Sequence, residues 1–255
     1  MKLGCHAVLF RERIKTETEA IIRGLAETGF QGVEIGSRFF GTGEKQELLG
    51  LLGRYHLELS GMHVGGELRD WIDKEEAISA KVLAVAEFVK DTANPNVVLS
   101  GSRIAGPADL RAIAQNIEKV AGQCLRMGVR LNYHNHDWEF AAEAALFKAL
   151  AANAPSLYFG LDLGWVWAGG FDPMAIVSEV VPRVAYVHLR DPKGPGKEFV
   201  NLGEGVFDFS KLMSGLKTVL PEDGWAVVEY EEGEPDFGRY ARAKAFLDRV
   251  METGL

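Results

Sequence analysis

The chain has 255 residues, of which 47% are hydrophobic, a length close to that of one complete (β/α)8 barrel and enough to fill a large core. The net charge of −8 at pH 7, with charges of both signs interspersed, disfavours nucleic acid as a partner. The two cysteines are isolated and no signal-peptide pattern is present, which predicts a cytoplasmic protein. No apolar run reaches about 20 residues, so we expect no membrane span.

A short apolar strand followed by a longer amphipathic helix recurs along the chain. Apolar runs predict strands at residues 3–9, 32–36, 57–64, 97–100, 129–134, 158–163, 184–189 and 225–230. Helical spacing, with glycine at some ends and proline in some first turns, predicts helices at residues 16–28, 44–55, 74–91, 107–127, 141–153, 173–181, 209–220 and 237–251.

This alternation lacks hairpin signals and therefore predicts a parallel sheet. Eight even units favour closure into a single (β/α)8 TIM barrel over an open doubly wound sheet, and no GxGxxG or Walker-type loop follows a strand. No linker stands out, so we expect residues 1–255 to form one domain. The least regular segments, 65–73 and 191–208, follow strands and are expected to be loops over the active face.

Polar residues interrupt the apolar runs where the predicted strands end, and barrel strand ends converge on one site. These residues are Glu34, His63, His134, Asp162, His188 and Glu229, with Arg190 just after the seventh strand. Alternation with apolar neighbours points the last four strand-end side chains, from His134 to Glu229, into the barrel. Carboxylates there are costly unless a cation neutralises them, which predicts a divalent ion bound by His134, Asp162, His188 and Glu229. A hydrogen-bonded network without metal is the alternative.

Several strings resemble those of the sugar phosphate isomerase/epimerase family, also called xylose isomerase-like barrels. They are GFQGVE at 29–34, GVRL at 128–131, YHNHDWEF at 133–140, GLD at 160–162, VHLRD at 187–191, LGEG at 202–205 and VEY at 228–230. The resemblance implies one Mn²⁺-like ion held by Glu, Asp, His and Glu, the last three of which correspond to Asp162, His188 and Glu229. The donor types also suit Zn²⁺, Co²⁺ or Fe²⁺, and Mg²⁺ less well.

The first family Glu falls on His134, so a symmetric proton transfer between two Glu ligands is in question. We expect Glu229 to act as the base on a small hydroxy-ketone bound to the metal. His136 or Glu139 is the candidate for a second acid or base, unless the reaction needs only one. Return of the proton gives isomerisation or epimerisation of a sugar or keto-sugar. Loss of a β-oxygen gives a lyase acting on a keto-sugar, keto-glycoside or cyclitol.

Other polar and aromatic side chains after strand ends are candidates for substrate binding. Hydroxyl or anionic groups of a substrate suit His63, Glu34 and Arg190. Stacking on a sugar ring suits Trp138, Trp165 and Trp167, although packing is the commoner role for such aromatics. Arg190 could equally pair with Asp191 or Glu229. No Gly-rich phosphate cradle follows the last two strands, which favours a substrate without phosphate.

Two further readings belong to other classes. A metal-dependent endonuclease shares this barrel, but the negative charge and the six histidines argue against it. A non-catalytic sugar-binding or partner-binding barrel would lack an open metal site. We expect His6 and His56 to be structural, and the pattern leaves the oligomeric state open, with pairing of barrel helices into a homo-oligomer as one alternative.

Overall fold

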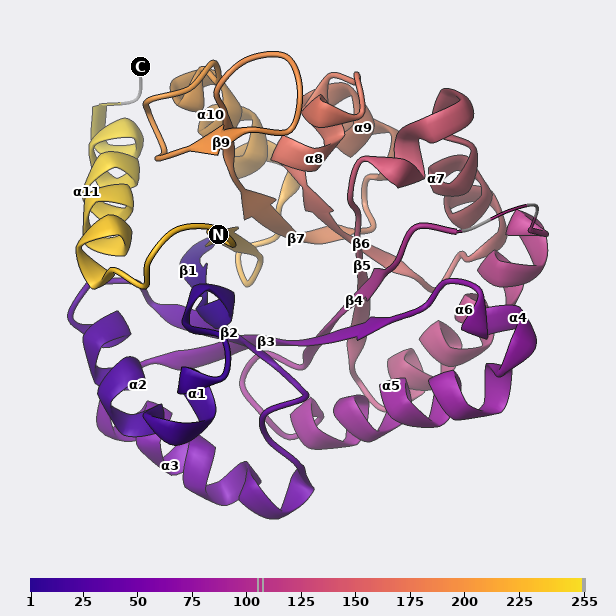
Figure 1. Ribbon diagram of the computed structural model, residues 1–255, viewed down its shortest axis with the longest axis horizontal. Coiled ribbons are helices and arrows are strands. Elements are labelled where there is room, and N and C mark those ends of the chain that lie inside the picture. The colour runs from indigo at the N-terminus through magenta and orange to yellow at the C-terminus, as the bar shows by residue number, and fades with distance from the viewer. Residues whose placement is uncertain (105, 107, 254–255) are drawn as a thin grey trace.

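A closed ring of parallel strands forms the centre of the molecule, and helices surround it (Figure 1). The computed structural model describes residues 1–104, 106 and 108–253. The barrel strands are β1 (Lys2–His6), β2 (Gly32–Gly36), β3 (Glu58–Gly66), β4 (Asn96–Gly101), β5 (Arg130–His134), β6 (Tyr158–Asp162), β7 (Val184–Leu189) and β10 (Trp225–Val228). They follow one another around the barrel, and β10 closes it by pairing with β1. The predicted TIM barrel is confirmed.

Most of the outer helices occupy the predicted segments with shifts at their ends, but the short helices at residues 13–16, 70–73 and 163–168 were not predicted. They are α1 (Arg13–Thr16), α2 (Thr18–Ala26), α3 (Lys45–Arg54), α4 (Asp70–Asp73), α5 (Glu75–Val89), α6 (Leu110–Arg126), α7 (Ala141–Asn153), α8 (Leu163–Ala168), α9 (Pro173–Val180), α10 (Phe209–Val219) and α11 (Phe237–Thr253). Among the described residues, four helices begin after an aspartate whose carboxylate accepts a backbone N–H in the first turn, at Asp109, Asp162, Asp172 and Asp208. The predicted start of α6 at Pro107 lies outside the described residues.

Two segments also differ from the predicted strands. The first strand ends at His6 rather than Leu9, because Ala7–Phe10 forms a short 3₁₀ helix, η1. The loop after β7 contains an antiparallel pair, β8 (Asp191–Pro192) with β9 (Phe199–Val200), where no hairpin was predicted. Strands of two residues are too short to show the alternation that reveals a hairpin in a sequence.

Large side chains fill the barrel below the carboxyl ends of its strands. Val98, Tyr186, Trp225 and Val227 form a fully buried cluster in the barrel interior. Gly32 makes room for it, since a Cβ there would lie 2.5 Å from the Trp225 ring. The Tyr186 hydroxyl donates to Glu34 Oε2 at 2.7 Å, so this buried cluster is hydrogen-bonded to a polar residue nearer the strand ends. No helix among the described residues is long and apolar enough to cross a membrane.

Candidate active site

A cavity of about 310 Å³ opens at the carboxyl ends of the barrel strands. Its polar wall is formed by His6, His63, Ser100, His134, His136, Glu229 and Glu231, and Arg38 and Lys81 also line it. Parallel strands in a barrel bring their ends to one face, which is why residues more than 200 positions apart meet here. Of the six predicted strand-end residues, His63, His134 and Glu229 line the cavity.

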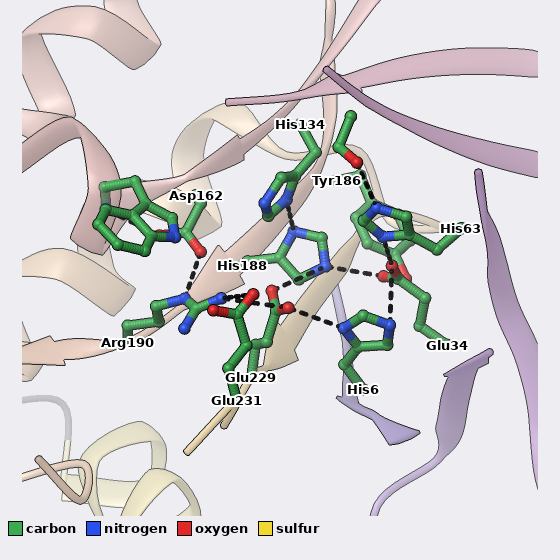
Figure 2. Close-up of polar contacts among 12 residues, drawn as sticks. His6, Glu34, His63, His134, Asp162, Tyr186, His188, Arg190, Glu229 and Glu231 are labelled. Carbon is green, nitrogen blue, oxygen red and sulfur yellow. Dashed lines mark hydrogen bonds and ion pairs between the residues drawn. The ribbon is translucent and has the colours of Figure 1, made fainter. Parts of the chain in front are cut away.

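Glu229 follows β10 and lies between Arg190 and His6 in the polar cluster (Figure 2). Its Oε1 accepts from His6 Nδ1 at 2.9 Å and lies 3.1 Å from Arg190 Nη2. Its Oε2 has no hydrogen-bond partner, although the residue is only 2% exposed. Burial works to raise the pKa of this carboxyl, but the charges of Arg190, His6 and His188 outweigh it and hold the pKa well below its usual range.

His188, the fifth residue of β7, joins two parts of the site. Its Nε2 donates to Glu34 Oε2 at 2.7 Å, and its Nδ1 lies 2.9 Å from His134 Nδ1. Burial disfavours the charged ring, but Glu34 and Glu229 raise the pKa of His188 to about 9. Burial and the neighbouring His188 lower the pKa of His134 well below its usual range. These opposite shifts favour His188 as the donor and His134 as the acceptor in this contact.

Asp162 ends β6 and has two fixed partners. Its Oδ1 accepts the backbone N–H of Trp165 at 2.8 Å, which caps α8, and its Oδ2 accepts from Arg190 Nε at 2.6 Å. Burial raises its pKa to about 6, against the opposing effect of Arg190. Asp162 is thus held at the site by a helix cap on one side and a guanidinium on the other.

Arg190 is the fixed positive charge of the site. Its side chain is 3% exposed, and its Nη2 lies 2.9 Å from Glu231 Oε1 in addition to its contacts with Asp162 and Glu229. Its guanidinium also lies over the Trp165 ring, 5.5 Å from the ring centre. Arg190 does not line the cavity, so these contacts favour pairing with the carboxylates over direct substrate binding.

The four predicted metal ligands lie together. Donor atoms of His134, Asp162 and Glu229 all lie within 4.8 Å of one another, and His188 Nε2 is 3.7 Å from Glu229 Oε2. Imidazole and carboxylate are ordinary ligands of divalent transition metals. Glu229 Oε2 has no hydrogen-bond partner, so this oxygen is available to coordinate an ion. The residues present therefore fit a divalent ion.

A family model described as xylose isomerase-like TIM barrel matches residues 22–250. The chain belongs to this family. Among curated relatives, the inosose dehydratase of Geobacillus kaustophilus is 23% identical over 91% of this chain and 87% of its own length. Among solved structures, the 3-keto-D-glucoside 4-epimerase of E. coli superposes with a TM-score of 0.76 at 17% identity, covering 98% of this chain and 99% of that one. A xylose isomerase-like protein of Mycobacterium smegmatis, in complex with magnesium, gives a TM-score of 0.76 at 14% identity, with coverages of 100% and 97%.

In this xylose isomerase-like barrel, sequence reasoning missed His6. Its ring lines the cavity between two acidic residues, with Nδ1 bonded to Glu229 and Nε2 3.6 Å from Glu34 Oε1. Burial works to lower the pKa of His6, but Glu34 and Glu229 outweigh it and raise the pKa. The missed signal was the position of His6 as the last residue of a strand that ends three residues earlier than predicted.

Glu34 and His63 stand side by side but differ in access. Glu34 is fully buried and does not line the cavity, whereas His63 does. His63 Nδ1 lies 2.8 Å from Glu34 Oε1, and His63 Nε2 lies 2.8 Å from Ser100 Oγ. Their predicted contact with substrate hydroxyls stays a prediction, and His63 is the one that a ligand in the cavity can reach directly.

The two candidates for a second acid or base have different surroundings. His136 lines the cavity, its Nδ1 has no hydrogen-bond partner, and burial lowers its pKa to about 4. Glu139 is fully buried away from the cavity, where it accepts from the Tyr133 hydroxyl at 2.9 Å and from the backbone N–H of His136 at 2.8 Å. Burial raises the pKa of Glu139 to about 7. The geometry favours His136 for contact with substrate and Glu139 for holding the His136 loop.

The tryptophans predicted to bind a sugar pack behind residues of the cavity or lie outside it. Trp138 stacks on the His136 ring with 4.1 Å between ring centres, and Trp165 packs against Arg190. Neither lines the cavity. Trp167 is 37% exposed and donates from Nε1 to the Gly194 carbonyl. Sugar stacking on these rings stays a prediction.

Proposed function

We propose that this chain is a metal-dependent lyase of a small keto-sugar or keto-cyclitol. It removes a proton from the carbon next to the carbonyl and releases a β-hydroxyl or β-glycosidic oxygen. The observation that carries this proposal is the buried carboxylate of Glu229, which has one unpartnered oxygen among donors suited to a divalent ion. The name of the relatives, inosose dehydratase, describes the loss of water from a cyclic polyol ketone and supports elimination.

The proposed ligands of the ion are His134, Asp162, His188 and Glu229. Mn²⁺ is the proposed ion, with Zn²⁺, Co²⁺, Fe²⁺ and Mg²⁺ as alternatives to be compared by metal analysis. When bound, the ion supplies a Lewis acid that polarises a substrate carbonyl and makes the neighbouring C–H acidic. Two imidazoles among the donors favour a transition metal over Mg²⁺, which prefers oxygen ligands.

Glu229 is the proposed base. Its Oε1 is anchored by His6 Nδ1 at 2.9 Å and by the nearby Arg190, so the direction of the carboxylate is fixed. Its Oε2 is left without a hydrogen bond, so one lone pair is available to the ion and the other to the proton taken from carbon. A base positioned in this way typically contributes about 10²–10⁴ to the rate.

His136 is the residue proposed to contact the departing oxygen. It lines the cavity, and its low pKa of about 4 leaves the ring neutral, with one N–H to donate and one nitrogen to accept. Stacking on Trp138 fixes the plane of the ring. His63 lines the same cavity and is proposed to bind a ring hydroxyl.

The arrangement of carboxylates favours elimination over epimerisation. Epimerisation moves protons on both faces of one carbon and needs a second acid or base opposite the first. Both carboxylates that line the cavity, Glu229 and Glu231, follow the same strand, β10. The β5 side of the barrel, three places away in the ring, contributes the imidazoles of His134 and His136 instead. Isomerisation or epimerisation shares the first proton transfer and is the second candidate, because superposable structures include a 3-keto-D-glucoside 4-epimerase.

The test is turnover of a keto-cyclitol (an inosose) and of 3-keto-glucosides in deuterium oxide with Mn²⁺ present. We expect a product that has lost water or the glycosidic alcohol, and deuterium in recovered substrate next to the carbonyl. Glu229→Gln should reduce the rate by about 10²–10⁴ while the protein stays folded. Glu232→Gln, an exposed neighbour, is the matched control.

The outcomes separate the candidates. A deuterated product of unchanged composition and altered configuration would make the protein an isomerase or epimerase. Turnover of either substrate without a fall in the Glu229→Gln variant would remove Glu229 from the role of base. Absence of both turnover and exchange on every keto-sugar offered, with metal bound, would overturn the enzyme proposal.

A further inference from the structure

A second cluster of donor atoms lies beside the proposed metal ligands. His6, Glu34 and His63 lie to one side of His188, and Asp162 and Arg190 lie to the other (Figure 2). One nitrogen from each imidazole and one carboxylate oxygen lie within 4.8 Å of one another. These residues belong to β1, β2 and β3, so the cluster is built by strands that the first group of ligands does not use.

We propose that His6, Glu34 and His63 form a second binding site for a divalent transition metal. The Glu34 Oε1 atom lies 2.8 Å from His63 Nδ1 and 3.6 Å from His6 Nε2. Ligand atoms about 2.1 Å from a tetrahedral ion are about 3.4 Å apart, so small side-chain shifts make room for the ion. Two imidazoles and one carboxylate suit Zn²⁺, Co²⁺, Fe²⁺ or Mn²⁺.

The outer nitrogen of each imidazole is held in the way that metal-bound histidines require. His6 Nδ1 contacts Glu229 Oε1 at 2.9 Å, and a carboxylate there only accepts, so Nδ1 carries a proton. His63 Nε2 contacts Ser100 Oγ at 2.8 Å, and a hydroxyl accepts this N–H equally well. In the neutral His6 ring, Nε2 is therefore left with a lone pair directed to the Glu34 side. His63 Nδ1 lies 2.8 Å from Glu34 Oε1 and donates to it in the metal-free chain. An ion would displace this proton while Ser100 Oγ accepts the N–H of Nε2, which gives the usual arrangement of partners around a histidine ligand.

Two hydrogen bonds hold the Glu34 carboxylate on the side away from His6 and His63. Its Oε2 accepts from the Tyr186 hydroxyl and from His188 Nε2, both at 2.7 Å, which leaves Oε1 for the cluster. The His6 and His63 rings are stacked, with 5.3 Å between ring centres and 8° between planes, so their inner nitrogens approach the same oxygen. Three ligands on a rigid barrel end give a preorganised site.

The cluster is open to the cavity on one side. His6 and His63 line the cavity, so solvent or a substrate oxygen reaches the remaining coordination position. Three protein ligands with one open position are typical of a site that touches substrate rather than of a structural site. The second ion would bind a substrate hydroxyl or carbonyl next to the group bound at the first site. This inference goes beyond the proposed function and stands on different residues.

The test is the number of Co²⁺ ions bound by the full chain after removal of metal, measured by equilibrium dialysis and elemental analysis. We expect two ions per chain in the natural protein and one in His63→Ala. His134→Ala should lose the other ion and keep this one, and the double variant should bind none. Ser100→Ala should weaken the second site by about 10-fold or more without loss of the first. His56→Asn, at an exposed histidine with φ +56°, is the matched control.

Two results would overturn the inference. One is a single bound ion in the natural protein that His63→Ala leaves in place. The other is two bound ions that both survive in His63→Ala and Ser100→Ala. A single ion lost in His63→Ala and kept in His134→Ala would instead support this site while overturning the metal site of the proposed function. Circular dichroism of each variant shows that a lost ion reflects a lost ligand and not an unfolded chain.

Discussion

Arg190 shows how a single side chain sets the charge of the site. Its guanidinium is buried and lies within 3.1 Å of carboxylate oxygens of Asp162, Glu229 and Glu231. Gly164 gives it room, since a Cβ there would lie 2.7 Å from the Arg190 Cβ. Buried charges are costly unless they are paired, so removal of one partner leaves the others uncompensated. Arg190 therefore makes a cluster of acids tolerable inside the barrel.

We expect Arg190→Met to lower the free energy of unfolding of the metal-free protein by about 3–5 kcal/mol, as for other broken buried ion pairs. Urea denaturation followed by circular dichroism measures the change. Arg103→Met is the matched control: its side chain is 64% exposed and pairs with Asp137, so about 1 kcal/mol or less should be lost. Equal denaturation midpoints for the two variants would show that the buried charge of Arg190 does not stabilise the site.

Some residues of the site could be identified from the sequence, and others could not. Asp162 and His188 were found because each interrupts an apolar run at a strand end, which is visible in a sequence. His6 was missed because the residues after it, Ala7–Phe10, are apolar and read as a continuation of the strand, although they form a 3₁₀ helix. The partners Ser100 and Glu231 carry no such signal, since only the closed barrel brings them to the cavity.

The loop after β7 is organised by Asp191. Its carboxylate accepts backbone N–H groups from Gly203, Gly205 and Phe207 at 2.8, 2.9 and 3.2 Å. The approach at Gly205 is so close that a Cβ would lie 2.2 Å from Asp191 Oδ1. Sequence reasoning left open a pairing of Asp191 with Arg190, and the structure instead turns Asp191 to the loop. The β8–β9 pair and the segment after it are thereby tied to the barrel end.

We expect Asp191→Asn to loosen this loop, because an amide replaces one of its two accepting oxygens with a donor. Hydrogen exchange should accelerate over residues 199–208, and the free energy of unfolding should fall by about 1–3 kcal/mol. Exchange measured by mass spectrometry on peptides checks the first effect. Glu198→Gln, in the same loop with a side chain 70% exposed, is the matched control. Unchanged exchange in Asp191→Asn would mean that contacts other than the carboxylate hold the loop.

At the scale of the molecule, the sequence pattern predicts the number of units and their parallel order well. Strands with two covered faces read as apolar runs, and the helices between them keep their 3.6-residue spacing. The register of the strands could not be predicted. The register shifts between Val33 and Glu34 and between Phe159 and Gly160. A shift of one residue changes which side chains point inward. Here Glu34 is fully buried, while His63 reaches the cavity.

The stability of the whole molecule should depend on pH through Glu139. Its pKa is raised from 4.5 to about 7 by burial, with Asp137 nearby adding to the effect, while its bonds from His136 N–H and Tyr133 oppose it. A folded-state pKa above the unfolded value means that the folded protein binds the proton more tightly. The stabilising contribution is therefore complete below pH 4.5 and is lost as the pH rises to about 7.

Glu139→Gln removes the titrating carboxyl group and should therefore change how the free energy of unfolding depends on pH. A pKa difference between 4.5 and about 7 corresponds to about 3 kcal/mol of stability lost by the natural protein across that interval. The glutamine amide cannot accept both the Tyr133 hydroxyl and the His136 N–H, but that cost is the same at every pH. The free energy of unfolding of the variant, relative to the natural protein, should therefore rise between pH 4.5 and 7, as measured by urea denaturation at each pH. Parallel profiles would mean that Glu139 stays ionised in the folded protein, and its two hydrogen bonds would then outweigh its burial.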